Sequence, residues 1–253
     1  MTQSGSFDAQ PGGSLDRRDL LARGLLLSAA ALTTGLAASA ALAEPASARL
    51  ETRLFNLRPD LAPNEAAAAV ARFKAQAMAA APSAFLIGAN EDKTPFPTRH
   101  EWLYMVQWPD SPQLTSNPRF QQFQRDQDAL AAVCVDQATC EVVAPLPARF
   151  ADAAGVGVRH VVMFSFKPEA TPDDQSRIVE AIRAMGRNSM AKSYVVQPHA
   201  PTQISPDHMQ WEVIGDFADM ADFRAYALAP AHLALRDDFT AHVSRVAFLD
   251  VAL

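Results

Sequence analysis

An internal repeat constrains the fold of this chain more than any other feature of its sequence. The segment that starts at Phe55 reads FNLRPDLAP, and the segment that starts at Phe164 reads FSFKPEATP, 109 positions later (164 − 55). The same interval separates Trp102 from Trp211. A register held over this distance predicts two copies of one structural unit, with any function lying either between the copies or where they differ.

Each copy has the pattern of strands and helices that is typical of a ferredoxin-like unit, β-α-β-β-α-β. In the second copy, Thr171 and Pro172 mark the start of the first helix, and Asp219 marks the start of the second. Strands are expected there over 158–166, 194–196, 211–217 and 243–251. In the first copy we expect strands near 50–58, 84–90, 101–108 and 138–144, and helices near 63–80 and 111–131.

A four-stranded sheet covered by helices on one side leaves its other side bare. Two such sheets can pack face to face within one chain and close a barrel of eight strands. Two independent domains would instead leave both apolar sheet faces in water. The sequence therefore predicts an α+β fold with a first repeat over 50–147, a linker over 148–157 and a second domain over 158–253. Because the repeats would pair internally, the chain is expected to be monomeric.

Residues 1–43 have the pattern of a secretory signal peptide. Arg17 and Arg18 precede an apolar run that ends in small residues, and such a pair is typical of the twin-arginine type. Cleavage is expected after Ala43, with Ala48 as a second possible site. The alternative is an uncleaved segment that anchors the protein in the membrane. Cleavage predicts a periplasmic or secreted protein with no stable membrane association.

Composition argues against several functions. The formal net charge is −6, with no Lys/Arg stripe, which argues against binding nucleic acid. No glycine-rich phosphate loop and no histidine spacing typical of a metal site is present, so neither a metal nor a cofactor is predicted. Cys134 and Cys140 are the only cysteines, and the sequence leaves open whether they form a disulfide or remain thiols.

Two segments of the second copy carry a family resemblance. The strand RHVVMFSFKP begins at Arg159, and YALAPAH runs from Tyr226 to His232. Both resemble motifs of the stress-responsive α/β-barrel (Dabb) family. The resemblance implies a dimeric α/β barrel, formed here within one chain, with a pocket between each sheet and its helices. The family includes a plant polyketide cyclase, although most members have no assigned reaction.

The resemblance also implies a candidate catalytic site formed by His160, Tyr226 and His232. An imidazole can remove a proton next to a carbonyl group, and a phenol can donate a hydrogen bond to the resulting enolate. Pro230 is expected to break the helix after Tyr226 and to aim His232 away from the course of that helix. The alternative is structural: His232 would start a helix and bond to the backbone. The chain departs from the family pattern at Ala229 and Trp211, where histidines are expected.

The first copy lacks this polar set. Its matching positions are Glu51, Phe123 and Ala129, so it resembles a structural partner for the second copy. Three functions remain open. The chain could bind a small, largely apolar ligand as a non-catalytic, stress-associated protein. It could be a cofactor-independent cyclase or isomerase acting by proton transfer on a carbonyl or polyketide-like substrate. It could also be a structural module whose barrel is filled by side chains.

Overall fold

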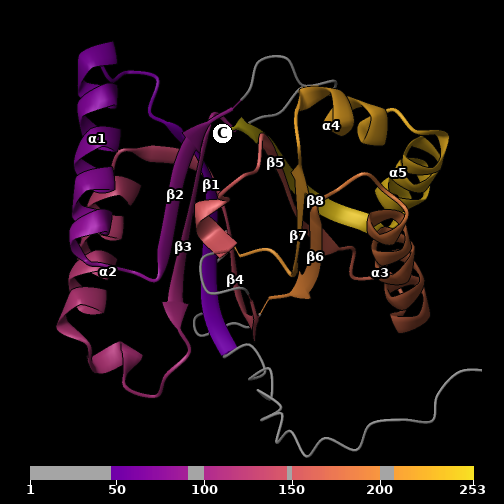
Figure 1. The fold of residues 1–253 in the computed structure, drawn as a ribbon, viewed down its shortest axis with the longest axis horizontal. Coiled ribbons are helices and arrows are strands. Elements are labelled where there is room, and N and C mark those ends of the chain that lie inside the picture. Colours follow the sequence, from indigo (N-terminus) through magenta and orange to yellow (C-terminus); the bar gives the residue numbers. More distant parts are fainter. Residues whose placement is uncertain (1–46, 91–99, 147–149, 200–207) are drawn as a thin grey trace, which may run out of the picture. The chain divides into compact units, whose positions relative to one another are not determined.

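Two four-stranded antiparallel sheets form the framework, one in each half of the chain (Figure 1). The first has the strand order β2-β3-β1-β4, and the second has the equivalent order β6-β7-β5-β8. The strands of the first sheet are β1 (Ser47–Leu57), β2 (Ala84–Ala89), β3 (Trp102–Pro109) and β4 (Cys134–Pro145). Those of the second are β5 (Val158–Phe166), β6 (Ser193–Pro198), β7 (Trp211–Phe217) and β8 (Val243–Ala252).

The computed structural model describes residues 47–90, 100–146, 150–199 and 208–253. These residues belong to one compact unit, Ala43–Leu253. The signal peptide expected over residues 1–43 lies outside the described residues. So do residues 147–149, between the two repeats.

The repeat in the sequence reappears in the pairing of the strands. Glu51 of β1 is paired with Val106 and Glu141 on its two neighbouring strands. His160 of β5 is paired in the same way, with Gly215 and Asp250, each 109 positions later (215 − 106 and 250 − 141). The two sheets therefore share one register, and a residue of one sheet can be compared directly with its counterpart in the other.

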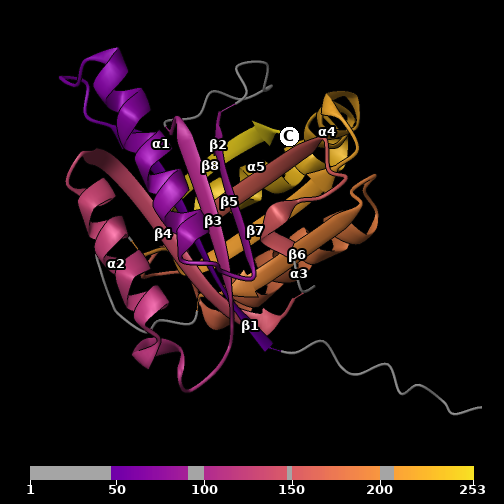
Figure 2. The same ribbon diagram turned by 60° about the vertical axis from the view of Figure 1, so that its left-hand side comes forward.

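The helices lie on the outer face of their own sheet (Figures 1 and 2). The first repeat has α1 (Pro63–Ala79) and α2 (Pro118–Ala131). The second has α3 (Pro172–Arg187), α4 (Met220–Ala227) and α5 (Pro230–His242). The Thr171 side chain accepts a hydrogen bond from Asp174 N, and that of Asp219 accepts from Ala221 N and Asp222 N, so both predicted helix starts are capped as expected.

Two helix predictions need correction. The helix expected over 111–131 starts only at Pro118, because Asn117 caps it and Leu114–Ser116 forms a separate short 3₁₀ helix. The break expected at Pro230 is present, because α4 ends at Ala227, but the segment after Pro230 forms a further helix, α5. Proline lacks an N–H but is tolerated at the first position of a helix. Pro230 therefore ends α4 and starts the next helix.

The inner faces of the two sheets share one hydrophobic core, as the barrel prediction requires. The side chains come alternately from each strand and are almost completely buried, among them Leu50, Leu103, Met105, Val161, Ile214 and Leu249. Phe150 and Ala151, in a short helical turn of the linker (Phe150–Asp152), join the same core. The fold is thus an intramolecular α/β barrel of two ferredoxin-like repeats.

The two cysteines are free thiols on opposite faces of β4. Cys140 is buried in the core between the sheets, whereas Cys134 packs against the cluster beneath α1 and α2. Burial raises the pKa of Cys134 to about 11 and that of Cys140 well above its usual range. Of the two alternatives that the sequence left open, the structure has the thiols.

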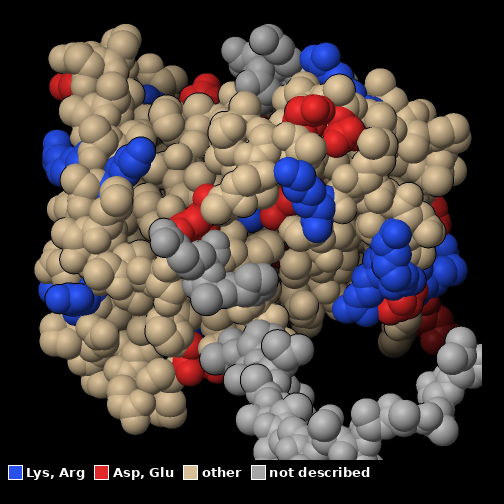
Figure 3. All heavy atoms as spheres, in the orientation of Figure 1, with Lys and Arg blue, Asp and Glu red and all other residues tan. Residues whose placement is uncertain are grey.

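Acidic and basic side chains are interspersed over the face of the molecule in Figure 3. Within the described residues, no helix has the length and apolar character needed to cross a membrane. The same residues contain no group of three or more His, Cys, Asp or Glu side chains arranged to hold a metal ion.

Candidate functional site

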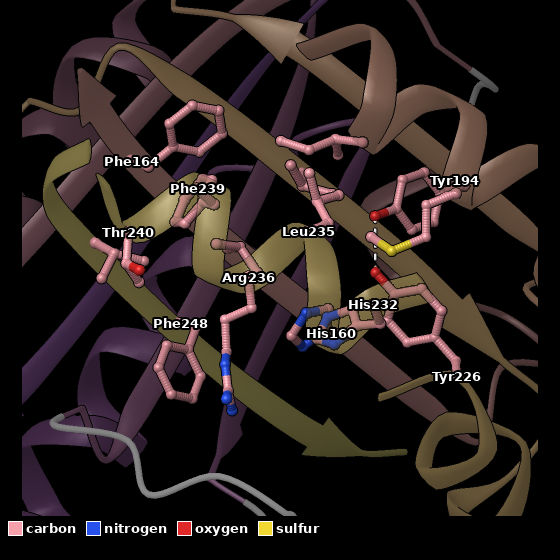
Figure 4. A pocket seen from close by; sticks show the side chains of 15 residues that line it. His160, Phe164, Tyr194, Tyr226, His232, Leu235, Arg236, Phe239, Thr240 and Phe248 are labelled. Carbon is pink, nitrogen blue, oxygen red and sulfur yellow. Dashed lines mark hydrogen bonds between the residues drawn. The ribbon is translucent and has the colours of Figure 1, made fainter. Parts of the chain in front are cut away.

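A cavity of about 280 Å³ lies between the second sheet and its helices. Its walls are mainly apolar side chains from β5, β7, α3 and α5, including Val162, Phe164, Ile182, Val213, Leu235 and Phe239. Polar side chains gather at one end, where Figure 4 shows His160, His232, Tyr194 and Tyr226 close together. Arg236 and Thr240 of α5 also line the cavity. This combination of apolar walls and a few convergent polar groups is typical of a small-molecule site.

His160 reaches the cavity because of strand alternation. Its neighbour Arg159 points into the barrel, so the next side chain along β5 points toward the helices. His160 Nδ1 lies 2.5 Å from Asp250 Oδ1, and both side chains are buried. A carboxylate can only accept a hydrogen bond, so Nδ1 carries the hydrogen in this pair. Asp250 thereby fixes the orientation of the ring.

His232 lies in the first turn of α5 and is half-buried. Burial and, to a smaller extent, the nearby His160 lower the pKa of its imidazole to about 4, although a hydrogen bond to the backbone of Ala227 acts in the opposite direction. The ring is therefore neutral at pH 7. His232 therefore fits both interpretations of the sequence. It is a helix-start residue bonded to the backbone, as in the structural alternative, and it also lines the cavity, as a site residue would.

Two tyrosines share a hydrogen bond at the polar end. The hydroxyl oxygens of Tyr194 and Tyr226 lie 2.8 Å apart, as the dashed line in Figure 4 shows. Burial raises the pKa of Tyr194 to about 12 and that of Tyr226 well above its usual range. Both phenols keep their protons at neutral pH. The rings of Tyr226 and His232 are 4.9 Å apart between centroids, so both residues can reach one ligand oxygen.

The structure brings together the three residues selected from the sequence. His160, Tyr226 and His232 all line this cavity, although their catalytic role stays a hypothesis. Sequence reasoning missed Asp250 and Tyr194. A signal for Asp250 was available: it is a carboxylate inside the apolar strand FLDV, where strand alternation turns it toward the helices.

The corresponding part of the first repeat is filled. The counterpart of His160 is Glu51, whose Oε1 accepts hydrogen bonds from Tyr104 (2.9 Å) and Gln127 (2.6 Å). Phe123 is fully buried against Phe73 and Trp108. Ala129 is exposed and lines a different cavity, between α1 and α2.

Side-chain size explains this difference between the repeats. Positions occupied by Val213 and Ile182 in the cavity of the second repeat hold Tyr104 and Phe73 in the first, 109 positions earlier (213 − 104 and 182 − 73). Both aromatic rings are fully or almost fully buried, and their centroids are 5.0 Å apart. The larger side chains occupy the space that the second repeat leaves open.

Comparison with known proteins connects the C-terminal repeat with a family. Residues 158–253 match the family model described as Stress responsive A/B Barrel Domain. No curated protein matches the chain.

Among solved structures, an anthrone oxidase-like protein is 11% identical, with a TM-score of 0.55, and the match covers 81% of this chain and 90% of that one. It has the same fold across both repeats. A dimeric ferredoxin-like protein of Thermobifida fusca YX is 23% identical, covering 40% of this chain and 93% of that one, with a TM-score of 0.34. A hydroxynitrile lyase of Passiflora edulis is 16% identical, covering 38% and 92%, with a TM-score of 0.36.

Proposed function

We propose that the C-terminal repeat, which matches the Stress responsive A/B Barrel Domain model, binds a small and largely apolar molecule that carries one polar oxygen. The cavity of about 280 Å³ is the observation that carries this proposal. The apolar body of the ligand would lie against side chains such as Phe164 and Phe239. Its oxygen would lie at the other end, between the Tyr226 hydroxyl and the His232 imidazole. We propose a non-catalytic, stress-associated binding role as the first candidate.

The binding proposal can be tested with 2-naphthol, a phenolic oxygen on an apolar body, by titration calorimetry with the purified protein. We expect saturable binding. Tyr226→Phe should weaken it by about 1–3 kcal/mol because a buried oxygen loses its donor. His232→Ala should weaken it about tenfold or more, with little change in the free energy of unfolding, because the ring is only half-buried.

A variant that fills the cavity of the second repeat tests the same proposal in a second way. Val213→Phe imitates the larger side chain that the first repeat has at this position and should abolish binding. The matched control is Ala129→His, which places a histidine at the exposed counterpart position and should leave binding unchanged. Undiminished binding by Val213→Phe in a folded protein would place the ligand elsewhere.

A second candidate is cofactor-independent proton transfer, favoured by the pairing of His160 with Asp250 and by the neutral His232. In this reaction the His232 imidazole takes a proton from the carbon next to a carbonyl group, the electron pair of the C–H bond forms the C=C bond of the enolate, and the π pair of the C=O bond moves onto oxygen. Tyr226 donates a hydrogen bond to that enolate oxygen. The proton then returns to carbon, or the enolate carbon attacks a second carbonyl group of the same molecule, whose oxygen takes the proton from His232 while the first carbonyl group re-forms.

Exchange of α-hydrogens of 2-tetralone for deuterium, followed by NMR in D₂O, tests this candidate. The rate should rise as pH increases through about 4, because the base is active only when deprotonated, and it should be level near neutrality. His232→Ala should reduce exchange to the buffer rate. If the wild-type protein binds 2-tetralone but exchange never exceeds the buffer rate, the non-catalytic role is favoured.

We also propose that residues 1–43 direct export through the twin-arginine route. A cut after Ala43 leaves β1 intact, whereas a cut after Ala48 removes the first two residues of that strand. Arg17→Lys combined with Arg18→Lys should keep the precursor in the cytoplasm. Cell fractionation and immunoblotting measure where the precursor accumulates. Normal export of the double variant would contradict the proposed twin-arginine route.

A further inference from the structure

Tyr194 holds a position in the site that neither the motif nor the family match assigns. It comes from β6, the edge strand of the second sheet, whereas Tyr226 comes from the end of α4. Its ring lines the cavity, and its hydroxyl lies 2.8 Å from that of Tyr226 (Figure 4). The two hydroxyls therefore form a short chain that ends at the cavity.

Two glycines make room for the Tyr194 ring. A Cβ atom at Gly186 of α3 would lie 2.1 Å from Tyr194 Cδ1, and one at Gly215 of β7 would lie 3.3 Å from Tyr194 Cδ2. Glycine is disfavoured both inside a helix and inside a strand. Here both positions border the same ring, and at Gly186 a methyl group would overlap it. The position of Tyr194 thus depends on a slot between α3 and β7.

The first repeat lacks both the slot and the hydroxyl. The counterparts of Gly186, Tyr194 and Gly215 are Ala77, Phe85 and Val106, each 109 positions earlier. Phe85 has no hydroxyl to offer, and the counterpart of Tyr226 proposed from the sequence, Phe123, has none either. The two tyrosines and the slot therefore occur together in the repeat that has the cavity.

We propose that Tyr194 is a positioning residue that acts through Tyr226, and that the pair selects a ligand whose oxygen is anionic, such as an enolate or a phenolate. This proposal rests on the proposed function. Each phenol has one hydrogen to donate. If Tyr194 donates to the Tyr226 oxygen, the Tyr226 hydrogen is free to point at the ligand. In the opposite arrangement Tyr226 has no hydrogen left for the ligand. Hydrogen bonds in such a chain also strengthen one another, most of all when the terminal acceptor is charged.

A double-mutant cycle with 4-nitrophenol tests the coupling, because absorbance distinguishes the bound phenol from the bound phenolate. Tyr194→Phe should weaken binding of the phenolate about three- to tenfold and lower the bound phenolate fraction. Tyr226→Phe should weaken it at least as much. The double variant should bind like Tyr226→Phe alone, because Tyr194 then has no residue to act through.

Gly186→Ala tests the slot without removing a hydroxyl. The added methyl group should displace the Tyr194 ring and reproduce the loss seen for Tyr194→Phe, with no further loss when the two changes are combined. The matched control is the opposite exchange in the first repeat, Ala77→Gly, which should leave 4-nitrophenol binding unchanged.

The outcomes separate the two proposals. If the wild-type protein binds neither 2-naphthol nor 4-nitrophenol, the proposed function fails, and the role of Tyr194 fails with it. If the wild-type protein binds both but Tyr194→Phe binds 4-nitrophenol normally, only the role of Tyr194 is overturned. The same holds if the full loss from Tyr194→Phe persists in the Tyr226→Phe background, since Tyr194 would then act independently.

Discussion

Replacing Arg159 with alanine is expected to destabilise the protein by about 3–5 kcal/mol, because it leaves a buried carboxylate without its partner. Arg159 is fully buried inside the barrel. Its Nε and one terminal nitrogen donate to the two carboxylate oxygens of Asp216 at 2.7 and 2.9 Å. The guanidinium also donates to the carbonyl oxygens of Phe150 (2.9 Å) and Ala151 (3.3 Å) in the linker. One side chain thus connects the second sheet to the segment between the repeats.

Urea denaturation of wild type and variant measures this loss. Arg187→Ala is the control, because that arginine is exposed at the end of α3, and it should change the free energy of unfolding by no more than about 0.5 kcal/mol. Arg159→Met combined with Asp216→Leu removes both charges and should be less destabilising than Arg159→Ala alone. A loss below about 1 kcal/mol for Arg159→Ala would show that the hydrogen bond from Ser193 is sufficient for Asp216 without its arginine.

Glu212→Gln is expected to make the protein more stable at alkaline pH by on the order of 3–5 kcal/mol. Glu212 is buried between the two sheets, and burial raises the pKa of its carboxyl from 4.5 to about 8, with Thr52 and Arg159 offsetting only part of the shift. The folded protein therefore holds a proton that the unfolded chain has already lost. Between pH 4.5 and 8 the wild type should lose stability as pH rises, and the glutamine variant should not show this loss.

Stability measured at pH 5 and at pH 9 separates this effect from a general change in packing. At pH 5 the two proteins should be similar, since a protonated carboxyl and a carboxamide have similar shape and polarity. At pH 9 the variant should be the more stable. Parallel stability curves across this range would mean that Glu212 ionises freely in the folded protein.

Local patterns were enough to predict most of the framework. Strand alternation predicted β5 over its whole length, and the capping residues Thr171 and Asp219 marked two helix starts. Alternation also explains why the adjacent Arg159 and His160 have unrelated environments, one inside the barrel and one in the cavity. The break after Tyr226 was predicted from Pro230, whereas the helix that follows it, α5, was expected only in the alternative structural interpretation of His232. A proline that ends one helix is also well suited to start the next.

The residues that form the site were harder to predict from the sequence than the fold. Asp250 meets His160 only through the pairing of β5 with β8, across 90 positions (250 − 160) of chain. Tyr194 meets Tyr226 because a helix and a strand each provide a glycine beside its ring. These contacts depend on register and packing between distant segments, whereas the motif residues were visible in two short stretches.

Fusion of the two repeats into one chain has a consequence for stoichiometry. Two identical subunits related by a twofold axis must present two identical pockets. Here the positions that line the cavity in one repeat hold Tyr104 and Phe73 in the other, so symmetry no longer dictates a second copy of the site. The expected binding curve is therefore hyperbolic, with one equivalent of ligand per chain and a Hill coefficient of about 1. The first repeat is correspondingly free to vary on its helix-covered side without altering ligand affinity.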